Sequence, residues 1–273
     1  MIRIGPAGIP LRFKGKFSTH EAIQHLPELG LNALEVQFVR GVKMSEEEAK
    51  LCRSNEIELS VHAPYFINLN AKENEKVEKS KERIIRSAEL ASLMGAKIVV
   101  FHPGYYMDTS PEEAYRNIKR ALEDISSELK DRKLEVFLGP ETMGKQKSFG
   151  TLEEILSLSE EVDGVKPVLD FSHIHARGNG SLRSREDFSR IFDEVDKRIG
   201  LEHIHSHFTG IFYENGNEKH HLTIDQGDLR FEHLAQEILD RGLDITIICE
   251  SPVLEEDAMK MVKILRGLGW RGN

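Results

Sequence analysis

The chain alternates short apolar runs with longer helix-like runs, about eight times at intervals of roughly 30 residues. The apolar runs, which we expect to be strands, cover residues 2–5, 33–37, 58–62, 97–102, 135–138, 167–170, 201–207 and 244–250. The helix-like runs cover residues 19–29, 45–55, 75–94, 111–129, 151–160, 185–198, 231–241 and 254–268. Strands that alternate with helices form a parallel sheet, and eight such units close it into a barrel. We therefore expect an α/β fold, a (β/α)8 TIM barrel that fills residues 1–273 as a single domain.

Length and composition limit the class of protein. A chain of 273 residues suits one barrel or two smaller domains, and the regular repeat without a linker favours the barrel. Cys52 and Cys249 lie far apart and form no CxxC pair, which predicts a reducing, cytoplasmic location and no disulfide framework. The chain starts without an apolar leader and has no run of about 18 apolar residues, so we expect no membrane partner. We also expect a monomer.

Histidines and carboxylates stand where six of the predicted strands end. In a parallel barrel the carboxyl ends of all strands meet at one rim, and that rim carries the active site. The residues are His62, His102, Glu141, Asp170 with His173 three positions later, His207 and Glu250. Any one of them alone could be a satisfied polar residue or a helix cap. Their shared position on successive strands instead predicts one site.

The residue types in this site indicate metal binding. Imidazoles mixed with carboxylates, without thiolates, suit zinc, manganese or iron at an open catalytic site. Zinc takes three or four protein donors, and the strand ends offer more, so we expect a cluster of two or three ions. In the seventh predicted strand His203, His205 and His207 alternate onto one face, with His207 nearest the rim. We expect His207 to be a ligand, with the other two lower in the barrel or behind the ligands.

The segment Glu218-Lys219-His220-His221 lies in what the pattern predicts to be a long loop. Two interpretations stay open for it. It is either a solvated charged loop, or its glutamate and one of its histidines complete a third metal site with His173.

Taken in order, these motifs resemble the endonuclease IV family of apurinic/apyrimidinic endonucleases, which are zinc-dependent TIM barrels. The resemblance runs from His62 to Glu250. The matching segments are Tyr65-Phe66-Ile67-Asn68-Leu69, Phe101-His102-Pro103-Gly104, Glu141 followed by Gly144, Asp170-x-x-His173, His207 and Glu250-Ser251-Pro252.

The resemblance implies three zinc ions per chain, with manganese as the alternative metal, and Glu141 as the catalytic residue. The implied ligands are His62, His102 and Glu141 for the first ion, Glu141, Asp170, His207 and Glu250 for the second, and His173, Glu218 and His221 for the third. The family has Asp-x-His at the third site, so His220 stays an alternative to His221. His221 is favoured because Gly227 follows it at the family-like distance.

The activity that the resemblance implies is hydrolysis of the DNA phosphodiester on the 5′ side of an abasic site, in base excision repair. The partner would be double-stranded DNA with abasic or 3′-damaged sites. Tyr65 and Phe66 stand where the family has residues that wedge into the gap left by the missing base, although such aromatics can also simply cover the barrel mouth. Arg40 would be the family's arginine that enters the base stack.

The net charge of −9 argues at first sight against a nucleic-acid partner. Its distribution matters more, because the predicted loops 6–18, 38–44, 141–150 and 171–183 contain nine basic residues and Glu141 as their only acid. The basic residues are Arg12, Lys14, Lys16, Arg40, Lys43, Lys145, Lys147, Arg177 and Arg183. We therefore expect a basic rim that faces a phosphate backbone.

A rival interpretation is a single-metal sugar isomerase or epimerase of the xylose isomerase-like barrels, which this chain also resembles. Such an enzyme would use Glu141, Asp170, His207 and Glu250. It has no need of His62, His102, His173 or the segment around Glu218, and their presence favours the nuclease. A non-catalytic DNA-binding barrel is the third possibility, and it leaves the predicted ligands without a purpose.

Overall fold

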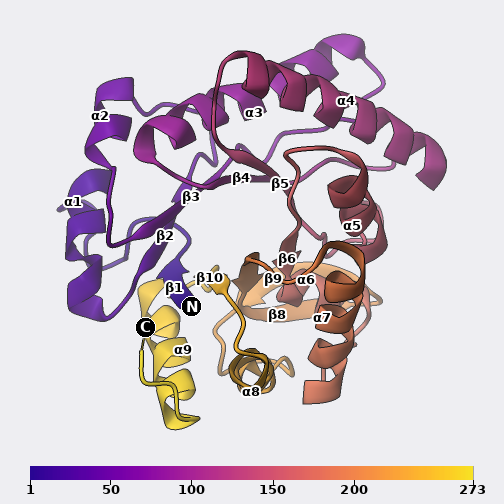
Figure 1. Cartoon of the computed structure of the whole chain (residues 1–273). Coiled ribbons are helices and arrows are strands. Elements are labelled where there is room, and N and C mark those ends of the chain that lie inside the picture. Colours follow the sequence, from indigo (N-terminus) through magenta and orange to yellow (C-terminus); the bar gives the residue numbers. More distant parts are fainter. Residues whose placement is uncertain (273) are drawn as a thin grey trace.

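The repeated units close into a ring of parallel strands in the computed structural model, which describes residues 1–272 (Figure 1). One half of the ring holds, in spatial order, β1 (Ile2–Pro6), β10 (Ile245–Cys249), β7 (Ile204–Phe208) and β6 (Val168–Asp170). The other half holds β2 (Ala33–Gln37), β3 (Glu58–His62), β4 (Ile98–Phe101) and β5 (Phe137–Pro140). Parallel bridges join the halves at both seams, between Ala7 and Glu35 and between Glu141 and Val168. The predicted α/β TIM barrel is therefore confirmed.

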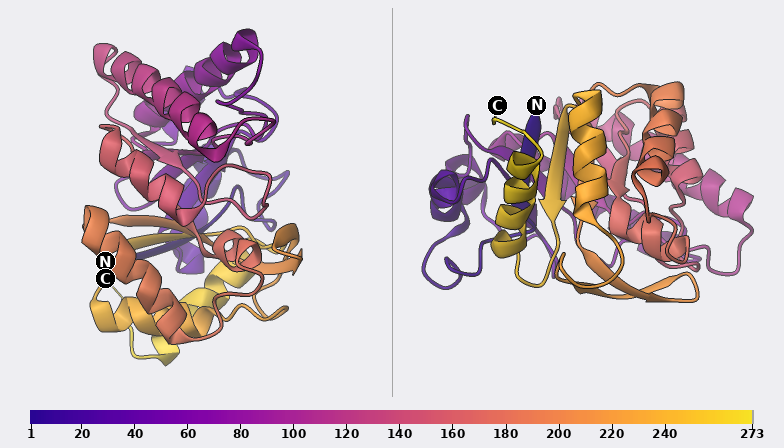
Figure 2. Two further views of the ribbon diagram at one scale, coloured as in Figure 1. Left: turned by 90° about the vertical axis from the view of Figure 1, so that its right-hand side faces the viewer. Right: turned by 90° about the horizontal axis from the view of Figure 1, so that it is seen from below.

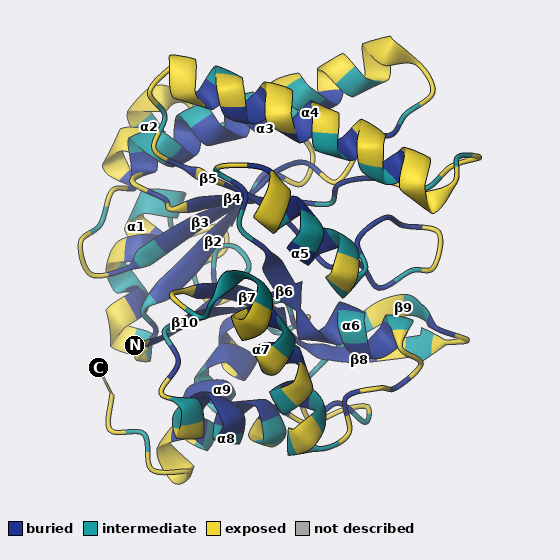
Figure 3. Cartoon of the chain, turned by 45° about the vertical axis from the view of Figure 1, so that its right-hand side comes forward, coloured by how far each residue is buried: buried dark blue, intermediate teal, exposed yellow. Residues whose placement is uncertain are grey.

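Helices surround the ring of strands, and the helices bury the faces that they turn toward the strands (Figure 1; Figure 3). They are α1 (Thr19–His25), the 3-10 turn η1 (Leu26–Leu29), α2 (Glu46–Leu51), α3 (Asn74–Met94), α4 (Pro111–Asp131), α5 (Leu152–Glu161), α6 (Phe171–Arg177), α7 (Arg185–Ile199), α8 (Phe231–Arg241) and α9 (Glu255–Gly267). In α4 the buried residues Ala114, Ile118, Leu122 and Ile125 recur every three or four positions, so one stripe faces the barrel.

Three helices begin at side-chain caps. Ser45, Ser110 and Thr151 precede α2, α4 and α5, and each side-chain oxygen accepts a hydrogen bond from the backbone N–H three residues later. In α5 the carboxylate of Glu154 also accepts from the backbone N–H of Thr151, which completes a capping box. These caps fix where each loop at the rim ends.

The structure differs from the sequence prediction beyond β7. The segment predicted as a long loop is an antiparallel hairpin, β8 (Gly210–Glu214) with β9 (Asn217–Leu222). Its two turn residues, Asn215 and Gly216, have φ values of 50° and 71°, which fits the Asn-Gly turn that suits a tight hairpin. Figure 2 shows the hairpin projecting from the end of the barrel opposite the two termini. The carboxyl ends of the strands lie at that same end.

Two further boundaries affect the site. β5 lies two residues later than predicted, because Phe137 pairs with Ile98, and Glu141 therefore follows the strand directly. The short helix α6, which the pattern does not predict, starts at once after β6. Among residues 1–272, no helix is both long and apolar enough to span a membrane.

Gly5 makes the seam between β1 and β2 possible, and this can be tested. A Cβ built on Gly5 would lie 1.7 Å from the backbone oxygen of Ala33, so Gly5→Ala must push the two strands apart. We expect the free energy of unfolding to fall by about 1–3 kcal/mol or more, measured by urea denaturation. The control is Gly267→Ala in α9, where a Cβ meets nothing within 4 Å. A Gly5→Ala protein as stable as this control would contradict the argument.

Candidate metal centre

Glu141 lies at the centre of the site, directly after β5, and is fully buried. Four histidine rings from different parts of the barrel approach its two carboxylate oxygens. The nitrogen–oxygen distances are 3.4 Å for His62 Nε2, 3.2 Å for His102 Nε2, 3.1 Å for His173 Nδ1 and 3.3 Å for His207 Nδ1. The parallel topology thus brings together residues that lie up to 145 positions apart in the sequence, from His62 to His207 (207 − 62).

A second group of donors shares Glu141. His207 Nδ1 lies 3.9 Å from Asp170 Oδ2 and 3.6 Å from Glu250 Oε1. One ligand atom from each of Glu141, Asp170, His207 and Glu250 lies within 4.8 Å of the others. The strands β6, β7 and β10 are neighbours in the ring, which explains why their ends meet.

Asp170 also determines where His173 lies. It is the N-cap of α6, and its Oδ1 accepts a hydrogen bond from the backbone N–H of His173 at 2.7 Å. The first turn of the helix then places the His173 ring beside the carboxylate that caps it. The Asp-x-x-His spacing is therefore a helix cap and a pair of candidate ligands at once.

The hairpin supplies a third group of donors. Glu218 Oε2 lies 3.3 Å from His173 Nε2, and Glu218 Oε1 lies 3.9 Å from His221 Nε2. The neighbouring residue in β9, His220, is exposed and packs instead against Phe212, with 5.2 Å between the ring centroids. Adjacent residues of a strand point to opposite faces, so only one of the two histidines can face the site. A β-bulge, where Phe212 pairs with His220 but Tyr213 pairs with Glu218, interrupts the alternation and puts His221 on the same side as Glu218.

Unpaired buried atoms show that these donors fit a metal. Seven buried side-chain atoms among the described residues lack a hydrogen-bond partner, and five of them belong to this site. The five are His62 Nε2, both carboxylate oxygens of Glu141, Asp170 Oδ2 and His207 Nδ1. Each such atom costs about 1–3 kcal/mol if nothing binds it. Cations satisfy all five together, and a set of nitrogen and oxygen donors without sulfur suits zinc or manganese.

The pKa shifts of Glu141, His207 and Asp170 also indicate a site that favours bound positive charge. Burial alone would raise the pKa of Glu141, but the His207 and His102 rings outweigh it and hold that pKa well below the usual carboxyl range. Burial would lower the pKa of His207, but Glu35 and Glu250 raise it well above the usual value. Burial raises the pKa of Asp170 to about 6, against the opposing effect of His173. The crowded carboxylates thus favour positive charge, which protons or metal ions can supply.

A cavity of about 440 Å³ opens above these donors. Its lining residues are Tyr65, His102, Tyr105, Met143, Lys145, Lys147, Ser148, His173, Glu218, His221 and Glu250. A larger hollow of about 790 Å³ lies at the other end of the barrel, around Arg3 and Glu58. None of the candidate metal ligands lines that hollow, so its larger volume does not make it the functional site.

The predicted DNA-binding residues lie in different places. Tyr65 stacks on His102, with 5.3 Å between ring centroids, and so covers part of the cavity while staying 42% exposed. Phe66 is 51% exposed, and the guanidinium of Arg83 lies 4.6 Å above its ring. Arg40 lines a separate hollow beside Lys43. Tyr65 is therefore the one of these three that lines the cavity.

The predicted basic rim needs a correction. Lys145 and Lys147 line the cavity, but Arg177 is partly buried and donates to the backbone oxygens of Lys145 and Ser148. Arg177 therefore holds the loop after β5 in place and does not face outward. Arg183 pairs with Asp228 at 3.2 Å, so its charge is also compensated.

Sequence reasoning missed Glu35. It is fully buried inside the barrel and contacts both His205 and His207. The signal was present, because a charged residue stands within the apolar run of β2, where it alternates with Leu34 and Val36. His203, by contrast, pairs with Glu58 and Asp244 near the start of its strand.

Known proteins resemble this chain in sequence. An uncharacterized protein of Methanocaldococcus jannaschii is 40% identical over 268 residues, which cover 96% of each chain. A probable endonuclease 4 of Mycoplasmopsis synoviae is 31% identical over 214 residues, 76% of this chain and 74% of that protein.

Two solved structures have similar folds. Endonuclease IV from Thermus thermophilus has a TM-score of 0.72 and 26% identity, over 93% of this chain and 95% of that one. A D-tagatose 3-epimerase-like protein has a TM-score of 0.70 and 25% identity, over 90% and 91%. A family profile described as "Xylose isomerase-like TIM barrel" matches residues 23–268. The chain therefore belongs to the xylose isomerase-like TIM barrel family, and its buried donor groups make it a metal-binding member.

Proposed function

We propose that the protein is a zinc-dependent endonuclease that hydrolyses the DNA phosphodiester 5′ to an abasic site in base excision repair. The observation that carries this proposal is the presence of three donor groups around Glu141. A pair of ions would need two such groups, and a single ion would need only one. Relatives of this chain include a probable endonuclease 4, and one similar solved structure is an endonuclease IV.

Each donor group would hold one zinc ion. The groups are His62, His102 and Glu141, then Glu141, Asp170, His207 and Glu250, and finally His173, Glu218 and His221. When bound, such ions lower the pKa of water and neutralise charge on both the attacking and the leaving oxygen of a phosphodiester. Glu141 belongs to two of these groups and would help to hold two of the ions, which makes it the residue on which cleavage depends most.

Other residues at the rim would hold the DNA. Lys145 and Lys147 line the cavity and can pair with backbone phosphates. Tyr65 lies above His102 and is exposed enough to fill the gap left by a missing base. Phe66 and Arg40 would contact the DNA beyond the cavity. Duplexes with 3′-damaged ends are a second substrate class for the same site.

A single-metal sugar epimerase or isomerase is the second candidate. The four donors Glu141, Asp170, His207 and Glu250 would suffice for it, and one similar solved structure is a D-tagatose 3-epimerase-like protein. This function leaves His62, His102, His173 and the hairpin residues Glu218 and His221 without a role.

Replacing the shared ligand tests the catalytic assignment. We expect Glu141→Gln to lower the nicking rate on a duplex with one abasic analogue by more than about 100-fold, because the loss of a shared ligand should exceed the 10–100-fold effect of residues behind the ligands. The control is Glu58→Gln, which alters a carboxylate–histidine pair at the opposite end of the barrel. A Glu141→Gln protein that nicks at the control's rate would exclude the role.

Counting bound metal separates nuclease from epimerase. We expect about three zinc ions per chain by mass spectrometry of the metal-loaded protein, and about two after His173→Ala, which removes a ligand from the hairpin group alone. The His173→Ala protein should also lose nicking activity. One ion per chain in both proteins, together with activity on ketosugars, would support the epimerase and reject the nuclease.

Tyr65 can be tested separately from the metals. Stacking of a base on an aromatic ring is worth about 1–3 kcal/mol, which corresponds to roughly 5- to 150-fold in affinity. We expect Tyr65→Ala to weaken binding of abasic duplex by a factor in that range while the zinc content stays unchanged. Phe137→Ala is the matched control, because Phe137 is similarly exposed, at 44%, but lies at the start of β5. Equal binding by both variants would mean that Tyr65 only covers the barrel mouth.

A further inference from the structure

Three candidate ligand histidines are oriented by backbone carbonyls. Each uses one ring nitrogen for the carbonyl and turns the other toward the donor groups. The pairs are His62 Nδ1 with the oxygen of Ala63 at 2.7 Å, His173 Nδ1 with that of Thr142 at 2.9 Å, and His221 Nδ1 with that of Glu250 at 3.0 Å. A carbonyl can only accept, so each of these nitrogens carries the proton and the other nitrogen is free to bind a cation.

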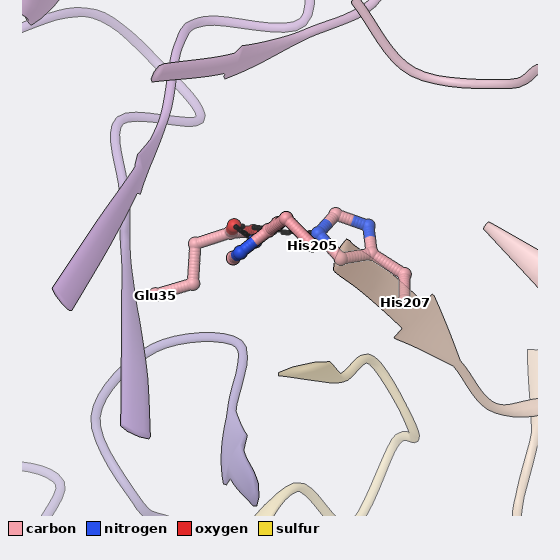
Figure 4. Close-up of side chains that lie close together, drawn as sticks. All are labelled: Glu35, His205 and His207. Atoms are coloured by element: carbon pink, nitrogen blue, oxygen red, sulfur yellow. Dashed lines mark hydrogen bonds and ion pairs between the residues drawn. The ribbon is translucent and has the colours of Figure 1, made fainter. Parts of the chain in front are cut away.

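His207 is oriented differently. Its Nε2 lies 3.2 Å from Oε1 and 3.3 Å from Oε2 of Glu35, while its Nδ1 points to Glu141 and Glu250. Figure 4 shows the Glu35 carboxylate, which comes from β2 on the far side of the barrel, directed at the rings of His205 and His207. A side-chain carboxylate here takes the place that a backbone carbonyl takes at the other three rings.

Glu35 is itself held firmly. It is fully buried, and beside His207 it accepts hydrogen bonds from Gln37 Nε2 at 3.0 Å, Ser60 Oγ at 2.9 Å and His205 Nε2 at 3.2 Å. Four donors occupy the lone pairs of the two oxygens, and neither oxygen is among the unpaired buried atoms. Glu35, His205 and His207 could also be grouped as a cation site, but a saturated carboxylate does not need another cation.

We propose that Glu35 is the positioning residue for His207: it keeps the proton on Nε2, so that the Nδ1 lone pair always faces the ion held with Glu141, Asp170 and Glu250. A carboxylate behind a ligand histidine also makes the ring a stronger donor. Ser60, Gln37 and His205 hold Glu35 in turn. This inference rests on the metal-binding part of the proposed function and is independent of DNA cleavage.

Zinc affinity provides the test. Glu35→Gln keeps the shape of the side chain but replaces one accepting oxygen with a donor. We expect the affinity of one zinc ion to fall about 10- to 100-fold, measured by competition with a chromogenic chelator, while the ion count at excess zinc is unchanged. The control is Glu58→Gln, whose carboxylate pairs with His203 at 3.3 Å in the same barrel but near the other end.

A double-mutant cycle separates positioning from general destabilisation. If Glu35 acts through His207, Glu35→Gln should change the zinc affinity by less than about twofold in a His207→Ala protein. Cobalt loading gives a second measure, because the visible spectrum of bound Co²⁺ should differ from wild type in Glu35→Gln and not in Glu58→Gln. Glu35→Asp is the variant to use if Glu35→Gln does not fold. It keeps the charge but withdraws the oxygens by about 1.5 Å, and the same loss is expected.

Three outcomes would overturn the proposal. The first is an unchanged zinc affinity in folded Glu35→Gln or Glu35→Asp protein, and the second is an equal loss in the Glu58→Gln control. The third is a wild-type protein with four ions per chain of which Glu35→Gln loses one entirely, since Glu35 would then be a ligand itself. Absence of nicking by a protein that binds zinc normally would reject the nuclease and leave the role of Glu35 untouched.

Discussion

A buried carboxylate at the mouth of the barrel, Glu141, is the group on which the rest of the site depends. Moving an ionised carboxylate out of water costs several kcal/mol unless other groups compensate it. Here the compensation comes from histidine rings on β3, directly after β4, on β7 and on α6, so four separate parts of the chain must meet at one point. The closed parallel barrel brings these strand ends together at one rim, which ties the architecture to the chemistry.

Most of the fold and much of the candidate site follow from the sequence, because parallel topology converts position along a strand into position in space. Once the strands are recognised, His62, His102, Glu141, Asp170 and His207 must share a rim. The hairpin was missed because β9 contains Glu218, Lys219 and two histidines, which lack the apolar alternation of a half-buried strand. Its Asn215-Gly216 turn was the available signal.

Glu35 was missed, and Arg177 was wrongly placed on the basic rim, for a different reason. The role of each residue depends on which distant part of the chain its side chain contacts in the fold, and its position in the sequence does not show this. Glu35 reaches a histidine 172 positions away, and Arg177 folds back onto carbonyls about 30 positions earlier. A sequence shows that a charge stands in an apolar strand or in a loop, but the partner that satisfies this charge is defined only by strand register and loop packing.

The unpaired atoms bear on the choice between one ion and several. A single ion at Glu141, Asp170, His207 and Glu250 would satisfy Asp170 Oδ2 and His207 Nδ1, yet His62 Nε2 would stay buried without a hydrogen-bond partner, 3.4 Å from a carboxylate oxygen of Glu141. A buried polar group without a hydrogen bond costs about 1–3 kcal/mol. A second ion held by His62, His102 and Glu141 would remove this cost. The burial pattern thus favours a cluster on energetic grounds that do not depend on which substrate the protein takes.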